Sequence, residues 1–382
     1  MDLALSDEQR LLRESAERFV AETYNADHRR RLANDPLGFS AEIWKQFAEL
    51  GWLALPIPEA YDGLGGGAVE IGILMEAFGR GLVSEPYLST VVIGAALIND
   101  CGSEAQKQAL LPGIADGSLY LAFAHSERAA RFDLGEVATT ARRTPEGWRL
   151  AGSKVAVLDG NAAGQIIVSA RTAGNNGAAG KLCLFLVPAD APGLTKRDFP
   201  RLGGGRACNL DLRDINLPAD ALLGDGSDAL PAIEAAVDRA MAALGAEAVG
   251  IMQTLLDQTL EYTKIRKQFG RPLSANQVIR HRLADMAMNC DEARSMALRA
   301  ALMIDAEPVA RGRAASGAKA KIGKCARFVA EQAVQLHGAM GVTEELDIGS
   351  YFKRLLAFDT LFGGSAHHYR RHAALGGRAV QI

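Results

Sequence analysis

Residues 237–270 have the sequence VDRAMAALGAEAVGIMQTLLDQTLEYTKIRKQFG, and this stretch decides the fold. Its apolar residues recur at the three-to-four spacing of a buried helical stripe. They are Met241, Leu244, Ala248, Ile251, Leu255 and Leu260. The spacing predicts one long helix, which ends at a basic and aromatic corner formed by residues 266–270. Pro272 follows, and proline cannot continue a helix without the loss of a hydrogen bond.

Glu247 is the only charged residue between Arg239 and Asp257. Its neighbours along the helix are small, with Gly245 and Gly250 on either side. Small residues let another surface approach a helix closely, and they leave Glu247 few local charge partners. We therefore expect close packing against this part of the helix.

Two blocks of this chain resemble the signature of the FAD-dependent acyl-CoA dehydrogenases. Residues 262–286, YTKIRKQFGRPLSANQVIRHRLADM, are similar to the family pattern YxxxRxQFGxPLxxxQxxxxxLADM. Residues 335–341, QLHGAMG, are similar to the family's QxxGGxG. The resemblance runs without gaps from about residue 237 to residue 365, and the two blocks at this separation are a specific signal.

The sequence of 382 residues is long enough for two to three domains. Residues 1–120 show helical apolar spacing, and residues 231–382 return to long helices. Between them, residues 121–230 contain short runs of β-branched and apolar residues separated by Gly, Asn and Pro. The expected fold class is α+β multidomain: an N-terminal helical domain, a middle antiparallel β-barrel or sandwich, and a C-terminal four-helix bundle. The family resemblance implies the same order.

The composition is that of an ordinary globular protein, 48% hydrophobic and 23% charged. A net charge of −3 gives no reason to expect binding to nucleic acid. The five cysteines are scattered singly, which argues against zinc and redox motifs and fits a reduced, cytoplasmic compartment. The N-terminus lacks the apolar segment of a signal peptide, and no apolar run is long enough to span a bilayer.

The resemblance implies oxidation of an acyl-CoA thioester to the trans-2-enoyl-CoA. In this reaction a carboxylate base removes the α-proton, oxyanion donors stabilise the thioester oxygen, and a bound FAD accepts the hydride. The family's usual base is a glutamate in a YEGT-like block, where this chain has Gly363, whose backbone N–H can still serve as an oxyanion donor. Members with the base on the long helix carry it where this chain has Ala240. Glu247 lies on a similar face, roughly 10 Å further along the helix. It is either a relocated base or a structural carboxylate paired with a cation from another helix or subunit.

In the family each FAD lies across a subunit interface, so the resemblance divides the expected flavin contacts in two. The loop expected to hold the isoalloxazine keeps a hydroxyl at Ser126 but has Phe132 in place of a serine. The strand end beside it has Ala156 and Leu158 in place of an aromatic residue and a hydroxyl. The set expected to hold the pyrophosphate and adenosine of a neighbouring chain's FAD is complete: Arg266, Gln268, Phe269, Gln277, Gln335, Gly338 and Gly341. Arginine suits phosphate because its planar fork gives charge-assisted hydrogen bonds.

Two further pairs of residues bear on the site. Asp238 matches a family position that contacts the CoA side of the substrate, and Arg239 is placed to meet a CoA phosphate. A solvated ion pair near the helix start is the alternative for these two. His367 and His368 suggest a metal, but adjacent residues on a helix face different ways and no carboxylate is spaced to join them. A polar helix terminus is the better interpretation, and no metal site is assigned.

Three hypotheses follow for the function. In the first, the chain is most similar to the small subunits of heteromeric members such as pimeloyl-CoA dehydrogenase, and it completes the FAD site of a larger catalytic partner. In the second, it is a self-sufficient dehydrogenase that uses Glu247. In the third, it is a scaffold subunit without flavin. The resemblance also implies an acyl-CoA substrate, electron-transfer flavoprotein as the acceptor, and a homo- or heterotetramer.

Overall fold

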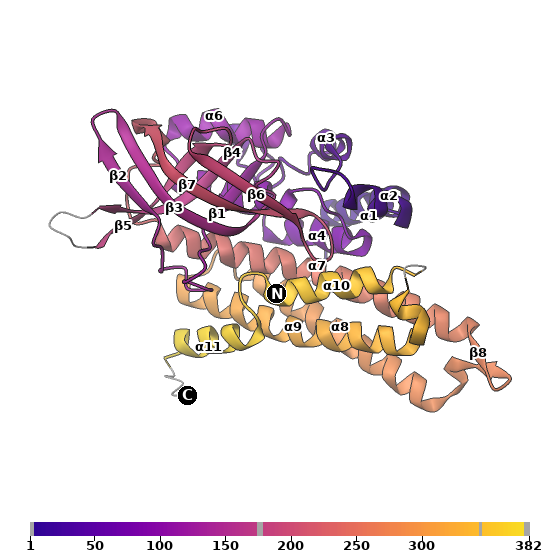
Figure 1. Ribbon diagram of the computed structural model, residues 1–382. Helices are drawn as coiled ribbons and strands as arrows, with labels where there is room; N and C mark the ends of the chain where they lie inside the picture. Colours follow the sequence, from indigo (N-terminus) through magenta and orange to yellow (C-terminus); the bar gives the residue numbers. More distant parts are fainter. Residues whose placement is uncertain (1–3, 174–178, 344–345, 378–382) are drawn as a thin grey trace.

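The chain forms three regions that follow one another along the sequence (Figure 1). The structure is a computed structural model, and it describes residues 4–173, 179–343 and 346–377. A curled sheet lies beside the N-terminal helices, and the long C-terminal helices run beneath both. This arrangement confirms the predicted fold class.

The N-terminal region is helical. Its elements are α1 (Asp7–Thr23), α2 (Ala26–Ala33), α3 (Ala41–Glu49), the 3₁₀ turn η1 (Glu59–Tyr61), α4 (Ala68–Gly81), the π-helical segment η2 (Tyr87–Ala95), α5 (Ala96–Cys101) and α6 (Glu104–Ala115). α1 begins at a capping box, in which Gln9 N–H donates to Ser6 Oγ at 3.2 Å and Ser6 N–H donates to Gln9 Oε1 at 3.0 Å. Phe47 of α3 stacks on Phe78 of α4 with ring centroids 5.0 Å apart, which fixes α4 against the N-terminal core.

The middle region is one twisted sheet. Its strands are β1 (Leu121–Ala124), β2 (Thr140–Thr144), β3 (Gly147–Leu158), β4 (Gln165–Ala173), β5 (Ala179–Pro188), β6 (Leu194–Pro200) and β7 (Arg206–Pro218). The pairs β2–β3, β3–β7, β6–β7 and β4–β5 are antiparallel, as predicted. β1 and β2 instead run parallel to β4. The long connections from these strands to β4 allow this pairing, because parallel strands need a crossover.

The C-terminal region is dominated by α7 (Leu230–Ile265), the long helix that the opening stretch predicts. The remaining elements are the short strands β8 (Lys267–Gln268) and β9 (Arg271–Pro272), the 3₁₀ turn η5 (Leu273–Ala275), α8 (Gln277–Leu302), α9 (Pro308–His337), the 3₁₀ segment η6 (Gly338–Val342), α10 (Ile348–Thr360) and α11 (Ser365–Leu375). No helix in the described part of the chain is long and apolar enough to cross a membrane.

α4 and α7 cross at very close range, which places both helices beside the site described below. A Cβ on Gly79 of α4 would lie 2.0 Å from the carbonyl oxygen of Glu247, and a Cβ on Gly250 would lie 1.9 Å from that of Glu76. Only glycine allows the two backbones to approach this closely. The predicted role of the small residues around Glu247 is therefore confirmed.

Candidate functional site

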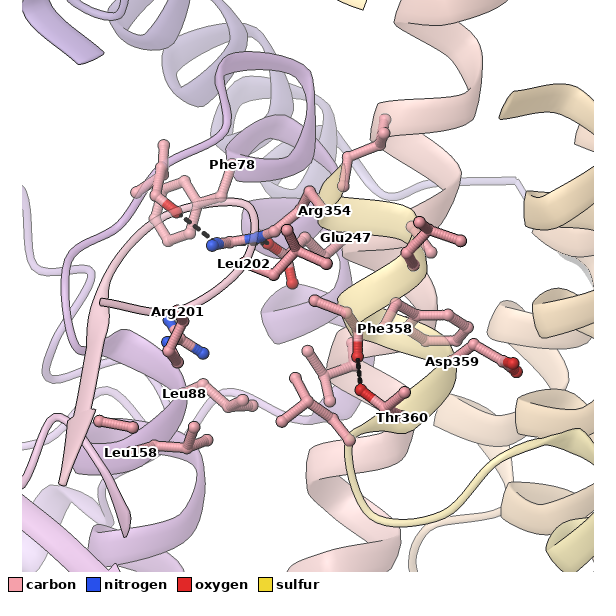
Figure 2. Close-up of a pocket in the computed structure, with 18 of the residues that line it drawn as sticks. Phe78, Leu88, Leu158, Arg201, Leu202, Glu247, Arg354, Phe358, Asp359 and Thr360 are labelled. Atoms are coloured by element: carbon pink, nitrogen blue, oxygen red, sulfur yellow. Dashed lines mark hydrogen bonds and ion pairs between the residues drawn. The ribbon is translucent and has the colours of Figure 1, made fainter. Parts of the chain in front are cut away.

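A cavity of about 420 Å³ lies between α4, α7, α10 and the loop that joins β6 to β7 (Figure 2). Apolar side chains form most of its wall, among them Met75, Phe78, Leu88, Leu158, Leu202, Leu244, Ile251, Phe358 and Leu361. The charged residues on the wall are Glu85, Asp159, Arg201, Glu247, Arg327, Arg354 and Asp359. A cavity of this size and composition is typical of a site for a small organic ligand.

Glu247 reaches this cavity in an ion pair with Arg354 of α10. Its Oε1 accepts from Nε of Arg354 at 2.8 Å and lies 2.7 Å from Nη2, and both side chains are at most 12% exposed. Nη2 also donates to the carbonyl of Val83 at 2.7 Å, and Nη1 donates to those of Gly203 and Gly204 at 3.3 Å. One guanidinium thus connects α7, the end of α4 and the β6–β7 loop. This contact favours the structural alternative for Glu247, and a catalytic role for it remains a prediction.

A second cavity, of about 1040 Å³, opens between the sheet, the start of α7 and α11. Ser126, Ala156 and Leu158 line it, and the contact of Ser126 with a flavin ring stays a prediction. Ala156 lies in a bulge between Lys154 and Val157 of β3, with φ at +53°. A bulge re-aims side chains, and here it exposes the small Ala156 side chain where the two cavities share a wall.

Gly363 cannot carry a side chain without rearrangement of its neighbours. Its φ is +110°, and a Cβ there would lie 2.7 Å from Cδ2 of His367 and 3.0 Å from Nε2 of His368. The histidine rings therefore occupy the space that a glutamate at position 363 would need. The Gly363 N–H, predicted as an oxyanion donor, makes a long contact of 3.4 Å to the carbonyl of Thr360. A donor role stays a prediction, and it requires this weak contact to be exchanged for a substrate oxygen.

Lys319 of α9 holds the loop that carries Gly363. Its Nζ donates to the carbonyl of Phe358 at 2.7 Å and to that of Gly363 at 3.0 Å, and lies 4.3 Å from the Phe358 ring centroid. Burial lowers the pKa of Lys319 to about 8. Sequence reasoning missed this residue, because Lys319 lies between Ala318 and Ala320 but Lys321 and Lys324 follow it, so the local pattern does not show which lysine is buried.

His367 and His368 form the first turn of α11 with rings nearly perpendicular, at 89°. His368 is buried, and its Nε2 contacts the carbonyl oxygen of Phe362 at 3.0 Å. His367 lines the larger cavity, 5.4 Å from the ring of Phe132. Burial lowers the pKa of both imidazoles, that of His368 to about 3, so both are neutral at pH 7.

Asp238 and Arg239, predicted as substrate contacts, are both engaged in ion pairs. Asp238 is fully buried, where its Oδ1 accepts from Arg371 at 2.6 Å and its Oδ2 from Arg311 at 3.1 Å. Arg239 lies 2.5 Å from a carboxylate oxygen of Asp100 at the wall of a separate cavity of about 280 Å³. These contacts favour the ion-pair alternative, and a contact to CoA stays a prediction for both residues.

The predicted adenosine-side residues gather at one end of the helical region. The β8–β9 hairpin projects from this end (Figure 1), and Phe269 at its tip is 99% exposed. Tyr262 of α7 stacks on His337 of α9 with centroids 4.3 Å apart, so the two family blocks lie side by side. The side chains of Arg266, Gln268, Gln277 and Gln335 are exposed, and none forms a hydrogen bond with the described residues.

The two glycines of the second block differ from one another. Gly338 is exposed with φ at +60°, and nothing lies within 4 Å of the position of its missing Cβ. Gly341 is buried, and a Cβ there would lie 2.9 Å from the carbonyl oxygen of Val334. Gly338 therefore leaves room for a ligand, whereas Gly341 lets η6 pack closely on α9.

The two halves of the predicted flavin site lie far apart in this chain. Val237 lines the cavity that contains Ser126, and Arg266 follows the last turn of the same helix. At 1.5 Å per residue, these positions are separated by roughly 40 Å along α7. One chain therefore cannot bring both halves to one ligand of dinucleotide size.

Three family models match successive parts of the chain. They describe the acyl-CoA dehydrogenase N-terminal domain over residues 6–118, the middle domain over 122–215 and the C-terminal domain over 230–374. The chain belongs to the acyl-CoA dehydrogenase family. It is an FAD-dependent oxidoreductase chain of the class that acts on acyl-CoA.

Individual relatives cover almost all of this acyl-CoA dehydrogenase chain. The probable acyl-CoA dehydrogenase YngJ of Bacillus subtilis is 33% identical over 355 residues, which are 91% of this chain and 92% of YngJ. A variant of the Tcur3481-Tcur3483 steroid ACAD is 30% identical with a TM-score of 0.86, covering 97% of this chain and 98% of that one. The ChsE4-ChsE5 complex of Mycobacterium tuberculosis contains a chain that is 26% identical with a TM-score of 0.87, and the match covers 100% of both chains.

The residues of this chain fit FAD unequally at its two halves. The exposed donors around Arg266, which have no partner in the described part of the chain, fit the phosphate and adenosine groups. At the other half, Ser126 offers a hydroxyl, but Ala156 and Leu158 offer no side-chain donor. When bound, FAD supplies the hydride acceptor for the reaction of the family.

Proposed function

We propose that this chain is a subunit of an FAD-dependent acyl-CoA dehydrogenase, in which it completes the flavin site of a partner chain. The observation that carries the proposal is the exposed polar set around Arg266, whose side chains have no hydrogen-bond partner among the described residues. This set lies beside the fully exposed Phe269 and roughly 40 Å from the chain's own cavity. Exposed donors beside a hairpin that projects from the chain suit a site that a second chain completes (Figure 1).

The state of the catalytic positions supports the same role. Gly363 and Ala240 leave both family base positions without a carboxylate, and Glu247 is paired with Arg354. The similarity to a chain of the ChsE4-ChsE5 complex supports a heteromeric assembly. In this proposal the base and most isoalloxazine contacts come from the partner, the substrate is an acyl-CoA that becomes the 2-enoyl-CoA, and electron-transfer flavoprotein accepts the electrons.

Within this assembly, Arg266 is the residue that holds a phosphate of the partner's FAD. Arg266→Ala removes a charge-assisted contact of about 1.5–3 kcal/mol, which corresponds to a flavin affinity about 10- to 100-fold weaker in the assembled complex. Lys267→Ala is the matched control, because Lys267 is an exposed cation on the same hairpin but lies outside the family pattern.

The measurement is the flavin retained through gel filtration, with its thermal release followed by fluorescence. Flavin loss in Arg266→Ala but not in Lys267→Ala supports the proposal. Equal retention in both variants removes the adenosine-side assignment.

A further inference from the structure

The buried imidazole of His368 in α11 contacts one polar partner at each ring nitrogen. Nε2 lies 3.0 Å from the carbonyl oxygen of Phe362, and Nδ1 lies 3.4 Å from Oγ of Ser316. A carbonyl oxygen can only accept, so Nε2 carries a proton. Burial and the nearby Lys319 ammonium lower the pKa of His368 to about 3, so the ring holds only one proton at neutral pH. Nδ1 is therefore an acceptor, and the hydroxyl of Ser316 donates to it.

The hydroxyl of Ser316 is fixed in turn by Arg371. Nη1 of Arg371 donates to Oγ of Ser316 at 3.0 Å, and because arginine has no acceptor, the serine proton remains available for His368. The same Nη1 donates to Oδ1 of Asp238 at 2.6 Å, and Oδ2 of Asp238 accepts from Arg311 at 3.1 Å. Asp238, Ser316 and His368 are each at most 1% exposed. Donation therefore runs in one direction, from Arg371, which the Asp238 carboxylate holds, to the imidazole of His368.

These contacts end on the peptide bond that joins Phe362 to Gly363. Its carbonyl accepts from His368, whereas its N–H makes only the 3.4 Å contact to the carbonyl of Thr360 among the described residues. The next carbonyl, that of Gly363, is held by Nζ of Lys319 at 3.0 Å. Phe362 also lines the cavity of about 1040 Å³. The peptide is thus fixed on its carbonyl side at the cavity wall, while its N–H is only weakly engaged.

We propose that one buried hydrogen-bond relay holds the peptide bond before Gly363 and keeps its N–H free to donate to an electron-rich oxygen bound at this turn. The members of the relay are Asp238, Arg371, Ser316 and His368. Hydrogen bonds in such a chain polarise one another, by about 10–30% per bond, so donation to the Phe362 carbonyl makes the N–H of the same peptide a stronger donor. A donor that is fixed in advance stabilises developing charge without rearrangement.

Asp238 and Ser316 are then positioning residues, which act on the turn through Arg371 and His368 and need no direct contact with a ligand. The inference rests on contacts within one end of this chain. It does not depend on the proposed role of Arg266 at the other end of α7, and either can fail without the other.

The test is NMR of the full-length chain labelled with carbonyl-¹³C phenylalanine and ¹⁵N glycine. Only Phe–Gly peptide bonds then give a carbonyl–amide correlation, and the sequence has three: Phe78–Gly79, Phe269–Gly270 and Phe362–Gly363. Phe269 is 99% exposed, so its signal is an internal reference, and Phe269→Leu and Phe362→Leu assign the signals by their absence.

Ser316→Ala should move the Phe362 carbonyl and the Gly363 amide proton upfield together, because His368 becomes a weaker donor, and should leave the Phe269–Gly270 signal unchanged. Asp238→Asn should act in the same direction. Ser316→Ala keeps the ion pairs of Asp238, so it tests the relay even if Asp238→Asn does not fold. Ser295→Ala is the matched control, because the Ser295 hydroxyl bonds to the carbonyl of Asp291 on the exposed side of α8.

The imidazole is observed in the chain labelled with ¹⁵N histidine, with His368→Gln as the assignment variant. The parent should show a neutral ring protonated at Nε2, and Ser316→Ala should move the Nδ1 resonance toward that of a free imine nitrogen. Octanoyl-CoA added to the parent should move the Gly363 amide proton downfield as the thioester oxygen accepts from it.

Melting curves verify that each variant is folded. A ring protonated at Nδ1, or a Phe362–Gly363 signal unchanged in folded Ser316→Ala or equally changed in Ser295→Ala, overturns the relay and leaves these residues a packing role. A Gly363 amide proton that does not move with octanoyl-CoA overturns the donor role.

Discussion

Replacement of Glu247 by glutamine separates the structural and catalytic roles of this residue. Glutamine keeps the volume and one oxygen acceptor, but it removes the charge that faces Arg354 in a pair at most 12% exposed. Loss of one partner of a buried ion pair costs about 3–5 kcal/mol. The Arg354 guanidinium retains hydrogen bonds to the carbonyls of Val83, Gly203 and Gly204, so we expect the lower end, about 3 kcal/mol.

The assay is urea unfolding of the parent and of Glu247→Gln, together with stopped-flow reduction of the flavin in the assembled complex by acyl-CoA. Glu261→Gln is the matched control, because Glu261 lies on the same helix and is 63% exposed, and its effect should stay below about 0.5 kcal/mol. The double variant Glu247→Gln/Arg354→Gln should be less destabilised than the sum of the two single variants, since both act through one contact.

The opposite result would refute this reasoning. If Glu247 is the base, its replacement leaves stability within about 0.5 kcal/mol of the parent, and flavin reduction falls by about 100-fold or more. An unchanged rate of reduction beside a large loss of stability removes Glu247 from the chemistry.

Three further predictions concern the packing around the site. Gly363→Ala should lower the free energy of unfolding by about 1–3 kcal/mol or more, because φ is +110° and the new Cβ would lie 2.7 and 3.0 Å from two imidazole rings. Gly65→Ala should cost less, since φ is +65° there but the nearest side-chain atom lies 3.9 Å from the new Cβ. Equal losses of stability in urea unfolding would contradict the steric account. Gly250→Ala should destabilise the chain by more than about 3 kcal/mol, because the new Cβ would lie 1.9 Å from the Glu76 carbonyl oxygen. Gly72→Ala should be neutral or stabilising, since its new Cβ would lie 3.9 Å from the nearest atom. Similar melting temperatures for the two variants would contradict the close crossing of α4 and α7. Burial lowers the pKa of Lys319 from 10.5 to about 8 in the folded chain, so the unfolded chain binds more protons between these two pH values. The free energy of unfolding of the parent, relative to that of Lys319→Met, should therefore rise by about 3 kcal/mol from pH 8 to pH 10.5. A difference in unfolding free energy that does not change with pH would contradict the burial of a charged Lys319.

Local patterns in the sequence are enough to predict the framework of this protein. The apolar spacing of residues 237–260 predicts α7, and Ser6 with Gln9 predicts the start of α1, because each depends on residues within one or two helical turns. The glycines around Glu247 likewise predict a close helix crossing. The two family blocks predict the cluster around Arg266, although only the structure shows that Tyr262 and His337 bring them together.

The contacts inside the cavities depend on residues that are distant in sequence. Sequence reasoning gave pairing with a cation from another helix as one alternative for Glu247, but it did not identify that cation. Arg354 is more than 100 residues from Glu247 and belongs to a short helix, so no spacing rule connects them. One signal was available: Arg354 lies beside Leu355 on the face of α10 that also carries Tyr351 and Phe358, which are buried. Arg201 gave no such signal, because its burial depends on how the β6–β7 loop folds against α10.

The central claim, that this chain completes the flavin site of a partner, is tested most directly by native mass spectrometry of the assembly purified through a tag on this chain. The account predicts a hetero-oligomer that contains one partner chain for each copy of this chain and one FAD for each partner, and predicts that the chain produced alone retains little FAD. A homo-oligomer with one firmly bound FAD per chain would contradict it.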